Sequence, residues 1–306
     1  MNFLESVITI SASAFRSSSP LIYAALGGIC SERCGVVNIA LEGKMLFGAF
    51  CAAAVTHFTH SAWIGFFCGG LAGLFLANIY ALFVIFLRSN QIVAGTAITL
   101  LAMGVVPFIS QLLFQNTGMT PEIPLQERFI KAPIILSWVL VVLIWGLFKY
   151  SPIGLWFKFA GEHPEALQTS GIDVLKTRIV GVSFSGFLAG LGGATLSLCM
   201  ASNYTRNMTA GRGYMALAAL IVGGWKPVRA AMACLLFGLF DAIGIMMQGS
   251  SFSFEESQSQ AFHFILKFLT SGQFIQIIPY ILTIIIVSGL VVRSRPPRAL
   301  GQHFRK

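Results

Sequence analysis

Long runs without a charged residue are the feature that most constrains this chain. The stretches 61–87, 91–115, 179–205 and 273–292 contain no Lys, Arg, Asp or Glu. A helix needs about 20 apolar residues to cross the hydrocarbon core of a bilayer. Only 10% of all residues are charged, against about 25% in a soluble domain. The sequence therefore predicts an all-α polytopic membrane protein, because the strands of a membrane β-barrel would read as short alternating segments.

Three further runs add to the predicted spans. The uncharged run 45–87 is long enough for two helices, and the sequence HFTHS at 57–61 divides it. Residues 132–148 form a short apolar span. Residues 228–248 form another, which contains one acid, Asp241.

Two apolar segments, 21–30 and 213–225, are too short to cross. As helices they would reach only about 15–20 Å, against a hydrocarbon core of about 30 Å. Each contains Ala-Ala-Leu followed by Gly-Gly, and paired short segments of this kind indicate an internal repeat with a substrate site between halves. Ordinary tight helix packing explains them equally well. We expect eight to ten transmembrane helices, some short or re-entrant, in a single integral domain over residues 1–306.

Basic residues predict the orientation of the chain, because cytoplasmic loops of membrane proteins are enriched in Lys and Arg. When the basic tail 293–306 is placed inside and the spans alternate backwards, 14 of the 20 Lys and Arg residues fall inside. They are Arg33, Lys44, Arg88, Lys149, Lys158, Lys176, Arg178, Lys226, Arg229, Arg293, Arg295, Arg298, Arg305 and Lys306. The same assignment accounts for the net charge of +9, so that binding to nucleic acid is not needed to explain it. It places loop 150–178 in the cytoplasm and loops 116–131, 206–212 and 249–262 outside.

Small residues recur every four positions on two of the predicted spans. They are Ser61, Gly65, Gly69, Gly73, Ala77 and Ala81 on the first, and Gly186, Gly190 and Ala194 on the second. Such stripes let helix backbones approach closely in a membrane. We expect both stripes to be structural.

The stretch 31–45, SERCGVVNIALEGKM, is the most polar part of the N-terminal region. Ionisable groups at membrane depth are costly and indicate function, whereas the same groups in a cytoplasmic loop would pair in water. We expect Glu32, Arg33 and Lys44 at the cytoplasmic side and Asn38 deeper. The stretch is no phosphate-binding loop, since Asn38 and Met45 replace the first Gly and the final Ser or Thr of G-x-x-x-x-G-K-[ST].

Five polar residues are candidates for a substrate pathway: Asn38, Glu42, Asn90, Gln91 and Asp241. Asn90 and Gln91 begin a span, where they could equally satisfy the free backbone groups of its first turn. Asp241 is a lone carboxylate in an apolar span. It could carry a proton or be a hydrogen-bonded structural acid.

The segment 161–172, GEHPEALQTSGI, is a polar interruption between apolar spans. Pro164 suits the first turn of a helix, Glu165 there favours the helix dipole, and Gly171 can end the helix. The residues by themselves are compatible with a short cytoplasmic helix or with a plain solvated loop.

Four blocks of the sequence resemble, in order, the signatures of one permease family. They are ALGGICSERCGVVNIALEGKMLFGAF (25–50), SNQIVAGTAITLLA (89–102), GEHPEALQTSGI (161–172) and GRGYMALAALIVGGWKP (211–227). Together they resemble ABC-importer membrane permeases of the simple-sugar and nucleoside type, which are similar to the branched-chain amino acid and ribose permeases. The residues of these motifs and the length of the chain most resemble the shorter permease of a bacterial nucleoside importer pair.

This resemblance implies a multi-subunit importer in the inner (plasma) membrane of a bacterium, with a cytoplasmic C-terminus. Its other parts would be a cytoplasmic ABC ATPase, a second, longer permease that forms a heterodimer with this chain, and an extracytoplasmic solute-binding (lipo)protein. The permease itself would be no enzyme and would hold no cofactor or metal, and its environment would be membrane lipid.

The resemblance also implies that segment 161–172 is the element that couples to the ATPase. The residues that match are Gly161, Glu162, Pro164, Glu165, Ala166 and Gly171. Many relatives have Asn at the position of His163 and Ala-Ala at the position of Ala166-Leu167, so this chain departs from the family pattern at these positions.

A stand-alone proton-coupled secondary transporter, with Asp241 as the proton carrier, is the alternative function. It would need no neighbouring genes for an ATPase and a binding protein, whereas an importer subunit needs both. A membrane-embedded enzyme has no support, because no Ser/His/Asp array and no paired intramembrane carboxylates are found in the sequence.

Overall fold

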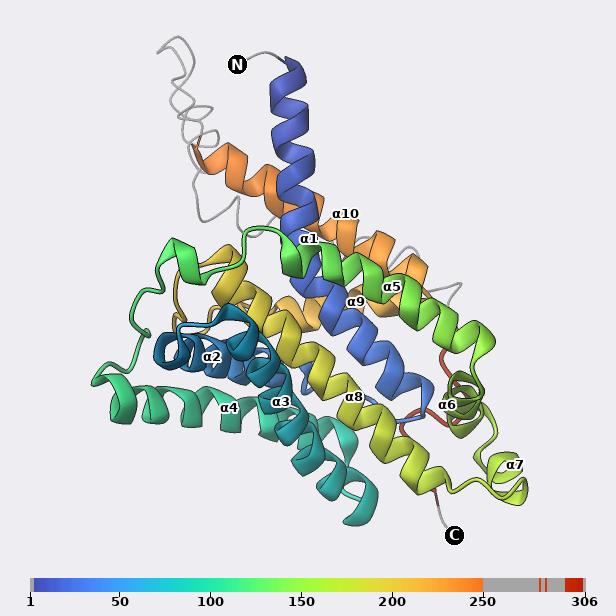
Figure 1. Ribbon diagram of the computed structural model, residues 1–306. Helices are drawn as coiled ribbons and strands as arrows, with labels where there is room; N and C mark the ends of the chain where they lie inside the picture. The colour runs from blue at the N-terminus through green and yellow to red at the C-terminus, as the bar shows by residue number, and fades with distance from the viewer. Residues whose placement is uncertain (1–2, 250–280, 282–283, 285–294, 305–306) are drawn as a thin grey trace, which may run out of the picture.

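The computed structural model describes residues 3–249, 281, 284 and 295–304. Over these residues the chain is a bundle of helices (Figure 1). Its helices are α1 (Phe3–Arg33), α2 (Leu41–Thr59), α3 (Ala62–Ala81), η1 (Leu82–Phe86), α4 (Gln91–Phe114), η2 (Leu125–Glu127), α5 (Ala132–Tyr150), α6 (Pro152–Glu162), α7 (Pro164–Thr169), α8 (Val174–Thr195), η3 (Leu196–Met200), α9 (Arg212–Val222) and α10 (Pro227–Gly249).

Five of the helical segments in the described part of the chain are long and apolar enough to cross a membrane. They are Ala62–Phe86, Gln91–Phe114, Leu125–Tyr150, Val174–Met200 and Pro227–Met246. These agree with the predicted spans, and they confirm the all-α polytopic membrane class. The predicted division at 57–61 is also confirmed, because α2 ends at Thr59 and His60 adopts a left-handed conformation with φ 54°.

The prediction that 21–30 is a short segment was wrong. These residues lie inside α1, a helix of 31 residues. Arg16 and the serines before Pro20 interrupt the apolar pattern but not the helix, because their polar groups find partners nearby. Ser18 and Ser19 bond to the carbonyls of the preceding turn, and Arg16 donates to the Cys199 carbonyl at 2.7 Å.

The other short segment, 213–225, is indeed short, because α9 has only 11 residues. Its Gly-Gly pair ends the helix, and Gly224 has φ +60°. The corresponding pair in α1, Gly27 and Gly28, lies within a continuous helix. The two segments therefore differ in structure, and of the two explanations left open by the sequence they give no support to the internal repeat.

The predicted span 179–205 is shifted toward the N-terminus. Asp173 caps the helix by accepting from the backbone N–H of Leu175 at 2.9 Å, so that α8 starts at Val174. Arg178 therefore lies within the helix, where it is buried, and does not mark the start of the span. At the other end, residues 201–205 leave the helix and pair with loop 116–131: the Ile123 N–H bonds to the Ser202 carbonyl, and the Thr120 N–H to the Tyr204 carbonyl.

Close backbone contact between α3 and α8 holds the bundle together. A Cβ on Gly73 would meet the Gly186 carbonyl, and a Cβ on Gly190 would meet the Gly69 carbonyl. Gly48 of α2 packs into the same place, since a Cβ there would lie 2.6 Å from the Gly190 Cα. The predicted structural role of the small-residue stripes is confirmed. The helix backbones approach so closely at these glycines that no methyl group would fit between them.

The predicted grouping of loops into two ends agrees with the contacts. At one end, loop 116–131 bonds to residues 198–206, and His60 lies 2.9 Å from Glu127. At the other end, α6, α7 and the tail 295–304 gather (Figure 1). The predicted outer loop 249–262 and most of the predicted span 273–292 lie outside the described residues.

Gly190→Ala is expected to destabilise the chain by about 1–3 kcal/mol, because the added methyl group must push α8 away from α3. The measurement is thermal unfolding of the purified chain in detergent. Gly146→Ala is the matched control, since nothing lies within 4 Å of a Cβ at this position of α5, and Ala favours a helix over Gly. Equal midpoints for the two variants would contradict the close contact.

Candidate functional site

The segment 161–172 is organised by local capping signals. α6 ends at Glu162, and α7 follows as a helix of six residues, Pro164–Thr169. Pro164 occupies the first turn of α7, and Gly171 has φ +85°, a conformation that favours glycine. The predicted short helix is therefore confirmed. The predicted coupling loop 150–178 is more than a loop, because it contains α6, α7 and the start of α8.

α7 presents a polar face and keeps one apolar anchor. Leu167 is buried against the bundle, whereas His163, Glu165, Ala166 and Thr169 are exposed. Figure 1 shows α7 at the edge of the molecule, beyond the ends of the long helices. A short helix that is anchored on one side and exposed on the other can be contacted by a protein outside the bundle.

Gly161 and Glu162 lie in a different helix from Pro164, Glu165 and Ala166, the predicted coupling residues of α7. Both belong to α6, and Gly161 is buried. A Cβ on Gly161 would meet the carbonyl of Arg33 at the end of α1. Gly161 therefore allows α6 to pack on α1, whereas Glu165 and Ala166 are on the exposed surface of α7.

The C-terminal tail binds to this element, which the sequence did not predict. The Ala299 N–H donates to the Gly161 carbonyl at 2.7 Å, and the Gly301 N–H donates to the Gly35 carbonyl at 3.1 Å. Arg178 donates to the Gln302 carbonyl at 2.8 Å. The tail thus joins the end of α6, the loop after α1 and the start of α8.

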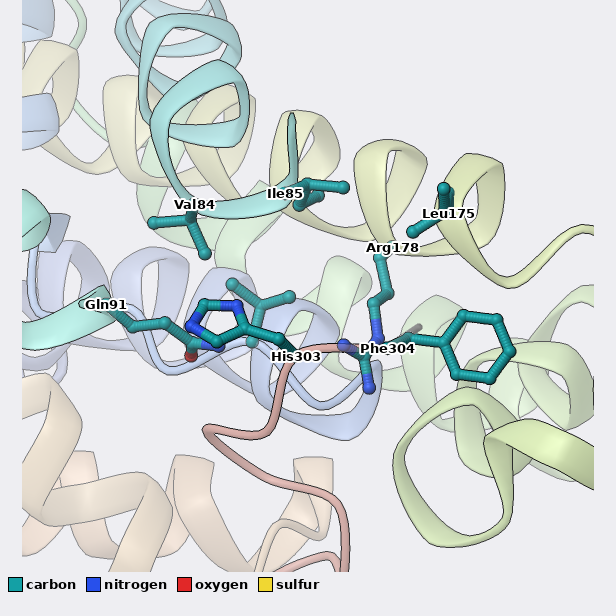
Figure 2. Close-up of a pocket in the computed structure, with 8 residues that line it drawn as sticks. Val84, Ile85, Gln91, Leu175, Arg178, His303 and Phe304 are labelled. Atoms are coloured by element: carbon teal, nitrogen blue, oxygen red, sulfur yellow. The ribbon is translucent and has the colours of Figure 1, made fainter. Parts of the chain in front are cut away.

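The end of the tail reaches η1 and the start of α4. Figure 2 shows His303 directed toward Gln91, and Phe304 beside Arg178. Val84 and Leu175 line the same small pocket. A clue in the sequence was available, because Arg178 is a cation at the start of an apolar span and needs hydrogen-bond acceptors there.

A hollow of about 320 Å³ lies between α7 and the tail. It is lined by Glu162, His163, Pro164, Glu165, Ala166, Arg298, Ala299 and Gln302. The coupling residues predicted from the sequence, except Gly161 and Gly171, form one wall of this hollow. The tail forms the other wall.

A buried polar network lies between the helices. Lys44 is fully buried and donates to the Asn38 side-chain oxygen at 2.7 Å, and the Asn38 amide donates to the Ser185 hydroxyl at 2.6 Å. The Lys44 ammonium also lies 4.7 Å from the centre of the Tyr80 ring. Asn38 and Lys44 are equally buried, with exposed fractions of 0%. The expected difference in depth between Asn38 and the cytoplasmic Lys44 stays a prediction.

Gln91 joins the same region through the backbone of the α1–α2 loop. Its side-chain oxygen accepts from the Val37 N–H at 2.8 Å. The Tyr80 hydroxyl donates to the Val37 carbonyl and to the Gln91 carbonyl. Asn90, in contrast, caps α4 by accepting from the Ile92 N–H at 2.9 Å. Its role in the structure is thus the capping role that the sequence left open.

Glu42 binds the start of α9. One of its oxygens accepts from the Gly211 N–H at 2.8 Å and the other from the Gly213 N–H at 2.7 Å. Free N–H groups at a helix start favour a negative charge. Glu42, predicted as a pathway residue, therefore fixes the short helix α9 to α2.

Asp241 stands alone in its apolar span of the sequence, but in the structure it has a partner, in agreement with the second of its two predicted roles, a hydrogen-bonded structural acid. The Arg212 guanidinium lies 3.4 Å from its carboxylate oxygen. The sequence places Arg212 in a different segment, so only the fold shows the pair. The pathway candidates thus fall into two groups, with Asn38 and Gln91 around Tyr80, and Glu42 and Asp241 around residues 211–213.

Glu32 is also held inside the protein instead of being solvated. It is 4% exposed and accepts from the Trp225 indole N–H at 2.6 Å. Trp225 has φ +55° and follows the glycines that end α9. Ser185, Tyr80 and Trp225 were missed from the sequence, because each is an ordinary residue in an apolar stretch and gains its role only from a distant partner.

Residues 10–288 match one family, described as "Branched-chain amino acid transport system / permease component". The chain belongs to this permease family. No solved structure matches the chain.

Several curated relatives of the family are similar over their whole length. "Guanosine ABC transporter permease protein NupQ" of Bacillus subtilis (strain 168) is 34% identical, covering 94% of each chain. "Nucleoside ABC transporter permease protein NupC" of Lactococcus lactis subsp. cremoris (strain MG1363) is 30% identical, covering 100% of this chain and 99% of the relative. "Putative glucose ABC transporter permease protein TsgC13" of Haloferax volcanii is 32% identical, covering 95% of each chain.

Glu42→Gln is expected to destabilise the chain by about 1–3 kcal/mol. The amide nitrogen would face a backbone N–H and leave it without an acceptor. The measurement is thermal unfolding in detergent. Glu122→Gln makes the same chemical change at an exposed side chain and should shift the midpoint little. Similar midpoints for both variants would mean that Glu42 does not hold α9.

Proposed function

We propose that this chain is the transmembrane permease subunit of an ATP-binding cassette importer, and that it forms the translocation pathway for nucleosides or related simple sugars. The observation that carries the proposal is the full-length similarity to the guanosine and nucleoside permeases. The similarity to a putative glucose permease supports the wider class of sugar-containing solutes. ATP hydrolysis would take place on a separate subunit.

The surface of α7 is proposed to receive the motion of the ATPase. Support comes from its geometry, because Glu165 and Ala166 are exposed while Leu167 is buried. The tail 295–304 joins α6 to the loop after α1 and to α8. The Ala299 N–H bonds to the Gly161 carbonyl, the Gly301 N–H bonds to the Gly35 carbonyl, and Arg178 of α8 donates to the Gln302 carbonyl. A push on α7 would then move several helices together.

Two further partners complete the proposal. An extracytoplasmic binding protein would deliver the solute at the opposite end, near the paired loops 116–131 and 198–206. A second, longer permease would form a heterodimer with this chain. Support for the pairing is that the Bacillus strain with NupQ also has "Guanosine ABC transporter permease protein NupP", which is 25% identical to this chain over 249 residues.

The protein is a multi-pass membrane protein, and we propose that its C-terminus is cytoplasmic. The tail shares one end of the molecule with α6 and α7, and the segment 293–306 carries five basic residues and no acidic residue, as is typical of a cytoplasmic segment. We propose that the pathway runs past both groups of candidates, Asn38 and Gln91 around Tyr80, and Glu42 and Asp241 around residues 211–213.

Glu165→Lys is expected to reduce uptake at least about tenfold and to release the ATPase during purification. The reversed charge would prevent α7 from seating on the ATPase, while the amount of permease in the membrane should stay the same because Glu165 is exposed. Glu122→Lys is the matched control for co-purification of the ATPase, since it makes the same charge change at the opposite end of the molecule. Wild-type uptake and co-purification with Glu165→Lys would refute the coupling role.

Uptake is expected to continue when the proton gradient is collapsed and ATP is maintained. The reason is that Asp241 is paired with Arg212, whereas a proton carrier must be protonated during each cycle. The measurement is solute uptake in cells with an ionophore, compared with cells in which ATP is depleted and the gradient is kept. Loss of uptake in the first case alone would favour the proton-coupled alternative.

A further inference from the structure

A second hollow lies at the ends of α1, α5 and α10. It has a volume of about 600 Å³ and is lined by Arg33, Trp145, Phe148, Lys149, Lys226, Pro227, Val228 and Arg229. Four of these residues are cations, and they come from three different parts of the chain. No carboxylate is among the described residues that line the hollow. The charge of Glu162 acts on Arg33 from α6 and offsets only part of the total.

The helix dipoles stabilise only two of these four cations. Arg33 and Lys149 lie in the last turns of α1 and α5, where a cation is favourable. Lys226 and Arg229 lie at the start of α10, where a cation is unfavourable. Both are exposed, and no salt bridge of either is found within the described part of the chain. An anion in the hollow would stabilise both, and it would also face the N-terminus of α10.

Aromatic side chains place the hollow at the level of lipid headgroups. The Lys149 ammonium lies 4.7 Å from the centre of the Trp145 ring and 4.9 Å from that of Tyr150. The Arg33 guanidinium lies 4.6 Å from the centre of the Phe148 ring. Trp and Tyr beside Lys and Arg at the ends of membrane helices are typical of the interface between water and hydrocarbon.

Exposed apolar side chains continue from the hollow along both neighbouring helices. α5 and α10 lie side by side (Figure 1). On α10 the exposed residues Val228, Met232 and Leu236 recur every four positions, and on α5 Val139 and Val142 are exposed. Such a surface suits acyl chains whose headgroup is held at the basic end.

We propose that this hollow binds the headgroup of an anionic phospholipid, whose acyl chains lie along α5 and α10. Basic pockets between transmembrane helices are suited to acidic headgroups. A soluble anion would use the cations and the start of α10 but would gain nothing from the apolar surface. The inference goes beyond the transport function, because it depends on neither the solute nor the ATPase.

The test uses the full-length purified chain in detergent. Phosphatidylglycerol, phosphatidylcholine with the same acyl chains, or inorganic phosphate is added, and bound lipid is measured by native mass spectrometry alongside the thermal midpoint. The variant is Lys149→Gln/Lys226→Gln/Arg229→Gln. The control, Arg88→Gln/Lys158→Gln/Lys176→Gln, removes the same charge from exposed cations elsewhere.

Wild type and control should bind phosphatidylglycerol at least about tenfold more tightly than phosphatidylcholine. The variant should lose this preference, because each cation near an anionic headgroup contributes about fivefold in affinity. Equal loss in variant and control, an unchanged preference in the variant, or equal stabilisation by inorganic phosphate would each overturn the proposal.

Single substitutions keep the test decisive if the triple variant is not produced. Lys226→Gln and Arg229→Gln should each weaken phosphatidylglycerol binding several-fold, and full binding in both would overturn the proposal. If the variants retain the lipid but release a second permease chain from the purified complex, the hollow is a protein interface and the proposal is again overturned.

Discussion

A polar loop buried between helices is the constraint on which the rest of the structure depends. Residues 34–40 connect α1 to α2 and are mostly buried, so that their polar groups need partners within the protein. These partners come from several helices: Tyr80 of α3 and Gln91 of α4 bond to the Val37 backbone, and Ser185 of α8 accepts from the Asn38 side-chain amide. The tail adds a bond to the Gly35 carbonyl. Satisfying this one loop therefore requires α3, α4, α8 and the tail to be in place together.

Much of the fold could be predicted because apolar length is a local property. The spans that became α3, α4 and α5 were visible as uncharged runs, and the span that became α10 was visible as an apolar run that contains Asp241. The prediction failed where polar groups inside a helix find partners from elsewhere. Arg16 donates to the Cys199 carbonyl and Arg178 donates to the Gln302 carbonyl of the tail. Both cations therefore lie within a continuous helix, although each interrupts the apolar pattern of the sequence.

The candidate site was predictable in the same local sense. Pro164 and Gly171 bound α7 through their own backbone preferences, and the sequence alone shows both. The partner of Asp241 lies 29 residues away and that of Glu42 about 170 residues away. No spacing rule connects such positions, so the ionic and capping roles of these acids required the fold.

The bond between Ala299 and Gly161 has a consequence for the surface around α7. Residues 298–302 of the tail form one wall of the hollow beside α7, and this backbone hydrogen bond holds that wall to the end of α6. Displacement of the tail would therefore open the hollow and expose the Gly161 carbonyl. The surface beside α7 would then change without any change in α7 itself.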